Sequence, residues 1–314
     1  MSFKILLLAP DVDPSWPEEI RRAVPGVVVK VFADPKDAAD DIVDADAAYG
    51  TVPPELLARA TKLRWICAAR AGLGGAWFYD ALVKSDVIVT NMRGSYNEHL
   101  GGHAVAFLLA FARRFDHYLP QKRWQRGPEM IDLPEKTVLI VGVGGAGGEA
   151  SKLCAALGMR VLGIDPRVTE RPAGMRDLAS PDQLEERLGE ADFVILTTPE
   201  TPDTVGMFNT SLFARMKRGA YFINIARGRC AVTADLLEAL RSGHLAGAGL
   251  DVADPEPLPP NHPLWSMPNV LITPHVAIYG TPYRDKWEAI LIENCRRFAA
   301  EQPLLNLVDK EKWF

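Results

Sequence analysis

Residues 137–147 read TVLIVGVGGAG, a run of five strand-forming residues that passes directly into the pattern G-x-G-x-x-G. In such a strand-to-helix turn Gly142 allows the tight bend, Gly144 lets backbone N–H groups approach a pyrophosphate, and Gly147 lets the following helix pack closely. The N-terminus of that helix stabilises negative charge. The stretch therefore predicts a βα unit that binds the phosphates of a dinucleotide.

On both sides of this motif, short apolar runs alternate with helical segments, which is typical of parallel sheets covered by helices. The runs that follow it predict a six-stranded Rossmann sheet, with strands at 137–141, 160–164, 193–197, 221–225, 247–252 and 270–273. The runs before it predict strands at 4–9, 27–32, 45–49, 63–68 and 87–90.

Proline followed by acids at 17–19 and 53–55 predicts two helix starts, and helical spacing extends over residues 97–118. A last helix, at 282–300, is followed by no further strand of the second series. We therefore expect this helix to pack in the first domain. The sequence thus predicts an α/β protein with domains at 1–94 plus 281–314 and at 95–280.

Composition limits the classes of function. The 314 residues include 35 basic and 40 acidic side chains, a net charge of −5, which disfavours nucleic acid as a partner. The longest apolar run, at 104–112, is far shorter than the roughly 20 residues that cross a bilayer. The four cysteines are widely spaced, so we expect reduced, buried thiols in a cytoplasmic protein that uses no metal.

An acidic residue follows the second strand of the Rossmann series. Asp165 stands 23 residues after Gly142, where a carboxylate can accept hydrogen bonds from ribose hydroxyls and so favours NAD. Arg167 and Arg171 follow closely, and guanidinium groups there can hold a 2′-phosphate. NAD is the first expectation, and NADP stays open.

Polar residues also end the later strands, at the edge where open α/β sheets bind ligands. Arg227 follows the strand at 221–225, and Asp251 ends the next one. Glu256 lies in a proline-rich loop, and His275 follows the last strand. A guanidinium can hold a carboxylate, and an imidazole with a carboxylate beside it can exchange a proton with a carbonyl oxygen.

Together with the glycine motif, this order of Arg, Asp, Glu and His resembles the D-isomer-specific 2-hydroxyacid dehydrogenases over nearly the whole chain. Further similar stretches lie at 63–72, 198–204, 256–265 and 303–308. Within the family the chain looks most like glyoxylate/hydroxypyruvate reductases. The resemblance implies a Rossmann domain, a discontinuous flavodoxin-like substrate domain, a homodimer, and hydride transfer between NAD(P)H and C2 of a small 2-keto acid.

The resemblance also implies roles for single residues. Arg227 would bind the substrate carboxylate, His275 would be the general acid, and Glu256 would be its carboxylate partner. The backbone at Ala71 and Gly72 would bind the substrate. The implied cofactor contacts are Gly142, Gly144, Gly145, Ala146, Gly147, Asp165, Pro166, Arg167, Thr198, Pro199, Ile225, Ala226, Arg227, Asp251 and His275.

An alternative is a dinucleotide-sensing, corepressor-like binding protein on the same scaffold, whose expected signature is the loss of His275 or Glu256. Phosphite, formate and phosphoglycerate dehydrogenases of the same broad family are less favoured. The chain departs from the family pattern at Gly74, Gly102 and Ala253, and at Ile278 and Tyr279 after the histidine. The resemblance therefore does not decide which 2-keto acid is the substrate.

Overall fold

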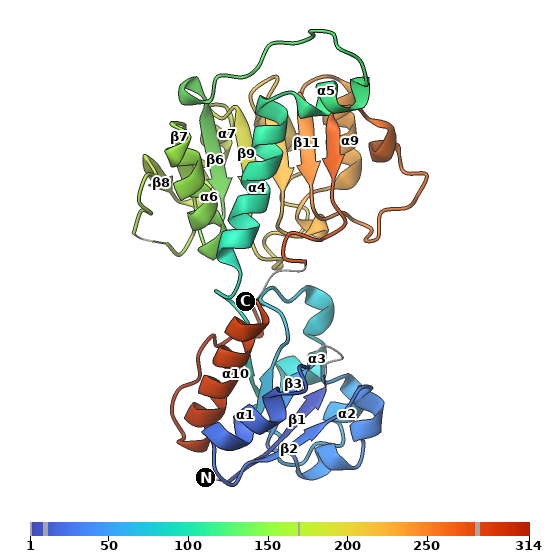
Figure 1. Cartoon of the computed structure of the whole chain (residues 1–314), viewed down its shortest axis with the longest axis vertical. Helices are drawn as coiled ribbons and strands as arrows, with labels where there is room; N and C mark the ends of the chain where they lie inside the picture. The colour runs from blue at the N-terminus through green and yellow to red at the C-terminus, as the bar shows by residue number, and fades with distance from the viewer. Residues whose placement is uncertain (1, 9–11, 169, 280–282) are drawn as a thin grey trace. The chain divides into compact units, whose positions relative to one another are not determined.

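The apolar runs form two parallel sheets in the computed structural model, which describes residues 2–8, 12–168, 170–279 and 283–314. The chain divides into two compact units, Met1–Ser95 with Pro282–Phe314, and Tyr96–Thr281, called unit 1 and unit 2 below (Figure 1). The predicted strand end at Ala9, the predicted boundary at residues 280–281 and the predicted helix start at Pro282 lie outside the described residues.

Unit 1 is built on a five-stranded parallel sheet in the order β2-β1-β3-β4-β5, which is the flavodoxin-like order. Its strands are β1 (Lys4–Leu8), β2 (Val28–Val31), β3 (Ala47–Gly50), β4 (Trp65–Cys67) and β5 (Ile88–Thr90). The inner strands β1, β3 and β4 are buried almost throughout, whereas Val28 and Val31 of the edge strand β2 are about half exposed. Continuous apolar runs therefore mark the strands that helices cover on both faces.

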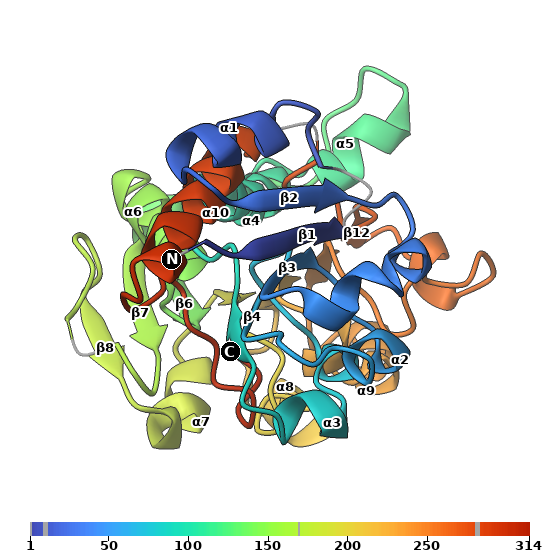
Figure 2. The ribbon, with the colours of Figure 1, turned by 90° about the horizontal axis from the view of Figure 1, so that it is seen from below.

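The helices of unit 1 are α1 (Trp16–Ala23), α2 (Pro54–Leu57), α3 (Asp80–Val83) and α10 (Arg284–Ala299). Helix α1 begins as predicted, with proline in its first turn and Glu18 and Glu19 at the positive end of its dipole. It packs beside α10, although the two are more than 250 residues apart in sequence (Figure 2). After α10 the chain pairs antiparallel with β5, through a bridge between Leu307 and Thr90.

Unit 2 contains a seven-stranded parallel sheet in the order β12-β11-β10-β9-β6-β7-β8. Its strands are β6 (Thr137–Val141), β7 (Arg160–Ile164), β8 (Asp177–Ala179), β9 (Phe193–Leu196), β10 (Tyr221–Asn224), β11 (Gly247–Leu250) and β12 (Val270–Ile272). This is the Rossmann strand order with one strand added, which confirms the predicted fold class. The predicted number of six strands in this sheet is wrong. The missed strand, β8, is a short edge strand that is only partly buried and begins with an acid, so it has no apolar run to mark it.

Helices cover both faces of this sheet. They are α4 (Asn97–Ala112), α5 (Phe115–Gln121), α6 (Gly145–Ala156), α7 (Leu184–Leu188), α8 (Thr210–Arg215) and α9 (Thr233–Arg241). Figure 1 shows α4 and α6 side by side over one face, in contact with each other and with the strands beneath. The helical spacing expected over residues 97–118 is divided between two helices, because Arg114 adopts a left-handed conformation (φ 56°) that separates α4 from α5.

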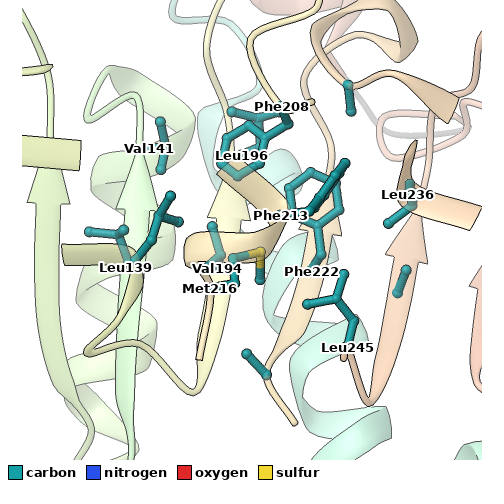
Figure 3. Close-up of a cluster of buried hydrophobic side chains, with 14 of the residues drawn as sticks. Leu139, Val141, Val194, Leu196, Phe208, Phe213, Met216, Phe222, Leu236 and Leu245 are labelled. Atoms are coloured by element: carbon teal, nitrogen blue, oxygen red, sulfur yellow. The ribbon is translucent and has the colours of Figure 1, made fainter. Parts of the chain in front are cut away.

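The opposite face of the sheet is covered by α7, α8 and α9 and holds a cluster of buried phenylalanines (Figure 3). Phe208, Phe213 and Phe222 are at most 1% exposed, and their ring centroids lie 4.9 to 5.7 Å apart. Each buried phenylalanine contributes about 1.5–3 kcal/mol. This packing gives the strand ends of unit 2 a rigid support.

Across the described residues, no helix combines the length and the apolar character that a membrane span requires.

Candidate active site

The glycine motif forms the turn between β6 and α6. Gly142 has φ +94°, and a Cβ on Gly147 would lie 2.0 Å from the carbonyl oxygen of Gly142, so both positions need glycine. A Cβ on Gly144 would meet no atom within 4 Å, so open space lies over this residue. No side chain caps the first turn of α6. These backbone N–H groups are therefore available to an anion, and the turn fits the pyrophosphate of a dinucleotide.

Asp165 follows β7 and is 6% exposed. Its Oδ2 accepts a hydrogen bond from the N–H of Val143 at 2.8 Å, inside the glycine turn. Its Oδ1 accepts the N–H groups of Arg167 at 2.8 Å and Val168 at 3.0 Å. A carboxylate has about four acceptor positions, so three are used by the backbone and about one is left for a ribose hydroxyl. The neighbouring residues Pro166 and Arg167 are exposed.

The loop after β9 carries Thr198 and Pro199. It lies against the glycine turn, because a Cβ on Gly142 would be 2.8 Å from the backbone nitrogen of Thr198. The loop is tied to the one after β10 by an ion pair of 3.0 Å between Arg229 and Glu200, whose side chain is 7% exposed. The two loops at this edge of the sheet therefore hold each other in place.

Arg227 lies in the loop after β10 and is half-buried. The Asn224 side chain, 1% exposed, shapes the turn: its Oδ1 accepts the Ala226 N–H at 2.9 Å, and its Nδ2 donates to the Arg227 carbonyl at 3.2 Å. Ile225 and Ala226 bury their side chains in the cores of unit 2, so only their backbone can face a cofactor. The amide of Asn224 thus presents Arg227 at the carboxyl end of the strand.

The loop after β10 lies very close to the loop after β11. A Cβ on Gly228 would lie 1.8 Å from the carbonyl oxygen of Ala253 and 2.8 Å from the backbone nitrogen of Asp254. Only glycine permits this approach. It places the segment that carries Arg227 directly against the segment that leads to Glu256.

His275 and Glu256 form the central pair of the site. The Nδ1 atom of His275 lies 2.6 Å from Oε1 of Glu256, and both side chains are a little under half exposed. Since an ionised carboxylate only accepts hydrogen bonds, Nδ1 carries the proton of this bond. Nε2 is then the nitrogen through which the ring can exchange a proton with a substrate.

The backbone around His275 is fixed by Asp251, which is 2% exposed. His275 has a left-handed φ of 54°, and its N–H donates to the Asp251 carbonyl at 2.8 Å. The Asp251 carboxylate accepts the N–H groups of Val276 at 2.9 Å and Ala277 at 3.2 Å, and the Thr273 hydroxyl at 2.7 Å. One buried acid therefore holds the chain before, at and after the histidine.

A cavity of about 320 Å³ lies against this pair within unit 2. Its polar wall consists of Asp251, Glu256 and His275, and apolar side chains that include Leu258, Trp265 and Ile272 line the rest. This combination of an apolar lining with a few converging polar groups is typical of small-molecule sites.

Ala71 and Gly72 belong to unit 1, in the turn after β4. The Ala71 carbonyl accepts the Asn91 side-chain amide at 2.7 Å, and the Arg70 carbonyl accepts the Met92 N–H at 3.0 Å. These bonds fix the turn in unit 1, and its role in binding the substrate stays a prediction.

Among the described residues, no three His, Cys, Asp or Glu side chains are grouped so that they could hold a metal ion. The cysteines Cys67, Cys154, Cys230 and Cys295 are free and buried.

Sequence reasoning missed several residues that shape the site. Asn224 is one, although an Asn three positions before Arg227 is a local signal for a side-chain-supported turn. The Glu200–Arg229 pair, Thr273 and His103 are others, and their partners are too far along the chain for such a signal.

Comparison with known proteins identifies the family. Residues 105–277 match the family described as "D-isomer specific 2-hydroxyacid dehydrogenase, NAD binding domain". A D-3-phosphoglycerate dehydrogenase from Archaeoglobus fulgidus is 32% identical over 82% of this chain, but the chain spans only 49% of that relative. A glyoxylate reductase from Korarchaeum cryptofilum is 33% identical over 83% of this chain and 80% of the relative.

Among solved structures, an NADPH-dependent glyoxylate/hydroxypyruvate reductase from Sinorhizobium meliloti, in complex with NADP and sulfate, is 31% identical with a TM-score of 0.86. The match covers 99% of this chain and 100% of that one. The chain therefore belongs to the D-isomer-specific 2-hydroxyacid dehydrogenase family of NAD(P)-dependent oxidoreductases.

Proposed function

We propose that the protein is an NAD(P)H-dependent reductase that converts a small 2-keto acid of the glyoxylate/hydroxypyruvate type into the D-2-hydroxyacid. The observation that carries this proposal is the 2.6 Å pair of His275 and Glu256 at the carboxyl edge of a Rossmann sheet. The names of the glyoxylate reductase and glyoxylate/hydroxypyruvate reductase relatives support the choice of substrate class.

A reduced dinucleotide held by the glycine turn and Asp165 would supply, when bound, a hydride (two electrons and a proton together) for C2 of the keto acid. His275 supplies the second proton, from Nε2 to the carbonyl oxygen, so that the carbonyl becomes a hydroxyl and the ring is left neutral. Glu256 accepts a hydrogen bond from Nδ1 throughout, which keeps the imidazole ring oriented for the transfer. Solvent then returns the proton to His275.

Arg227 binds the substrate carboxylate in this proposal. Its planar guanidinium presents paired donors that match a carboxylate and that can also polarise the adjacent carbonyl. The Asn224 amide fixes the backbone of the turn that carries Arg227, and this defines the point from which the Arg227 side chain extends. A charged fork at this point orients C2 of the keto acid for the transfer.

We further propose that Asp165 favours NADH over NADPH. Its carboxylate is held by three backbone N–H groups at the end of β7, where a 2′-phosphate would add a second negative charge. If Asp165 decides the choice, Asp165→Ala should raise the ratio of kcat/KM for NADPH to that for NADH. An unchanged ratio would place the discrimination at Arg167.

The test of the proposed reductase is an activity assay with glyoxylate, hydroxypyruvate, pyruvate and bulkier 2-keto acids. Turnover is measured as the loss of absorbance of the reduced nicotinamide. His275→Ala should lower kcat by a factor of about 10² to 10⁴ and change cofactor binding far less. A wild-type protein that binds the cofactor but turns over none of these acids would contradict the proposal and favour the sensor. A homodimer and a cytoplasmic location stay predictions from the resemblance and the composition.

A further inference from the structure

His103 lies on α4 and joins the hydrogen-bond network of Thr273 and Asp251 next to the catalytic pair. Its side chain is 22% exposed, its ring packs edge-on against Phe107, and its Nε2 atom lies 2.9 Å from the hydroxyl oxygen of Thr273. Nε2 is also 3.5 Å from Oδ1 of Asp251. The function proposed above makes no use of this histidine.

The chemistry of the partners decides the direction of these hydrogen bonds. The Thr273 hydroxyl has one proton, which it donates to Oδ1 of Asp251 at 2.7 Å because a carboxylate can only accept. Thr273 must therefore accept from His103, whose Nε2 carries a proton. The result is a directed relay in which His103 donates to Thr273 and Thr273 donates to Asp251.

The relay ends on the residue that fixes the catalytic histidine. The Asp251 backbone carbonyl accepts the N–H of His275, and its carboxylate accepts the N–H groups of Val276 and Ala277. His275 is in a left-handed conformation, which a non-glycine residue keeps only where its surroundings over-determine it. The Asp251 carboxylate, through Thr273, Val276 and Ala277, therefore fixes the backbone on both sides of His275.

We propose that His103 is a positioning residue for the reaction: through Thr273 it orients Asp251 and so holds His275 in its left-handed, proton-donating position. This inference rests on the proposed role of His275. His103 bonds Thr273, whereas Glu256 bonds the His275 ring, so the effect of His103 on the pair passes through the backbone of residues 273–277.

The test compares variants that keep or remove the donor. His103→Leu removes it, whereas His103→Gln keeps an N–H donor on a side chain of similar reach. We expect His103→Leu to lower kcat about tenfold with a KM for the cofactor within about twofold of wild type, since one supporting hydrogen bond is lost. His103→Gln should recover to within about threefold of wild type. Thr273→Val and Thr273→Ser form a second pair with the same expected contrast.

Hydrogen exchange supplies a readout that does not depend on turnover. In His103→Leu and Thr273→Val, the peptide over residues 270–279 should exchange faster, while His103→Gln and Thr273→Ser should keep the wild-type rate. Gly102→Ala is a matched control, because a Cβ there meets no atom within 4 Å, and it should leave kcat and exchange unchanged.

Two results would overturn the inference. One is wild-type kcat and exchange in His103→Leu; the other is an equal defect in His103→Gln and His103→Leu, which would assign the residue to packing alone. Failure of the proposed function is a separate outcome. In that case the wild-type protein would turn over no keto acid, while the difference in hydrogen exchange between the His103 variants could still be measured.

Discussion

Replacing Gly228 by alanine should separate two loops of the active site. A Cβ at this position would lie 1.8 Å from the Ala253 carbonyl oxygen, and the obstacle is backbone rather than a side chain that could rotate away. Real Cβ contacts essentially never fall below 3.0 Å, so the two loops must move apart by at least about 1.2 Å. The loops carry Arg227 on one side and lead to Glu256 on the other.

Two magnitudes follow from this displacement. A misplacement of about 1 Å at a catalytic centre costs on the order of 10²-fold, so kcat/KM for the best keto acid should fall by about that factor. Overpacking costs about 1–3 kcal/mol, which lowers Tm by roughly 2–12 °C in a domain of this size. Steady-state kinetics at the reduced-nicotinamide band and a thermal melt measure the two effects on the same preparation.

Gly102→Ala is the control for the substitution itself. It lies inside α4 with open space around the added methyl group, so it should raise the stability by about 0.5–1 kcal/mol and leave kcat/KM unchanged. Wild-type kcat/KM and Tm in Gly228→Ala would show that the loops are not in tight contact in solution, and the geometric basis of the Arg227 placement would fail.

Two further predictions concern stability and reactivity. Hydrogen bonds from Lys30 and Lys4 lower the pKa of Asp41 below its ordinary 3.8. The ionised Asp41 therefore stabilises the folded protein fully above pH 3.8, and this stabilisation is lost as the pH falls through the lowered pKa. Asp41→Asn should therefore reduce the free energy of unfolding by at most about 1 kcal/mol at neutral pH, and a difference from wild type that persists at the lowest pH would contradict this. Burial raises the pKa of Cys67 and of Cys154 to about 12, so a thiol reagent should leave both unmodified in the native protein and label them after denaturation. Mass spectrometry of the two cysteine peptides measures the labelling, and equal labelling rates in the native and denatured states would refute the prediction.

The elements that the sequence predicted well are those whose signal is local. Within the turn at residues 142–147, Gly142 needs glycine for its φ of +94° and Gly147 needs it for the close approach to the Gly142 carbonyl oxygen, so the sequence pattern follows directly from the local backbone. The strand at 137–141 is buried at every position, which is why it reads as a continuous apolar run.

The errors occur where local preference is weak. Strand β8 has three partly buried residues, and it exists because β7 offers an edge to pair with, not because its sequence favours a strand. The break at Arg114 falls in a segment with helical spacing on both sides. There the arginine Nε donates to the Glu129 carbonyl and a guanidinium nitrogen bonds the Tyr221 hydroxyl, contacts that only the folded chain supplies.

The candidate site divides in the same way. His275 and Glu256 are 19 residues apart, and the resemblance could pair them because their motifs follow one another along the chain. His103 and Thr273 are 170 residues apart, and nothing in either segment points to the other. Their contact depends on α4 lying over β10 and β11, which is a property of the whole sheet.

The path of the chain through unit 1 has a consequence for protein synthesis. Phe298 of α10 packs its ring against Phe3 and Trp65, with centroids 4.9 and 5.4 Å apart. While a ribosome is still translating unit 2, the first five strands have left the exit tunnel but lack this helix, so these aromatic rings are uncovered. We therefore expect the part of the chain made first to complete its fold last, with apolar surface exposed until residues 284–308 emerge.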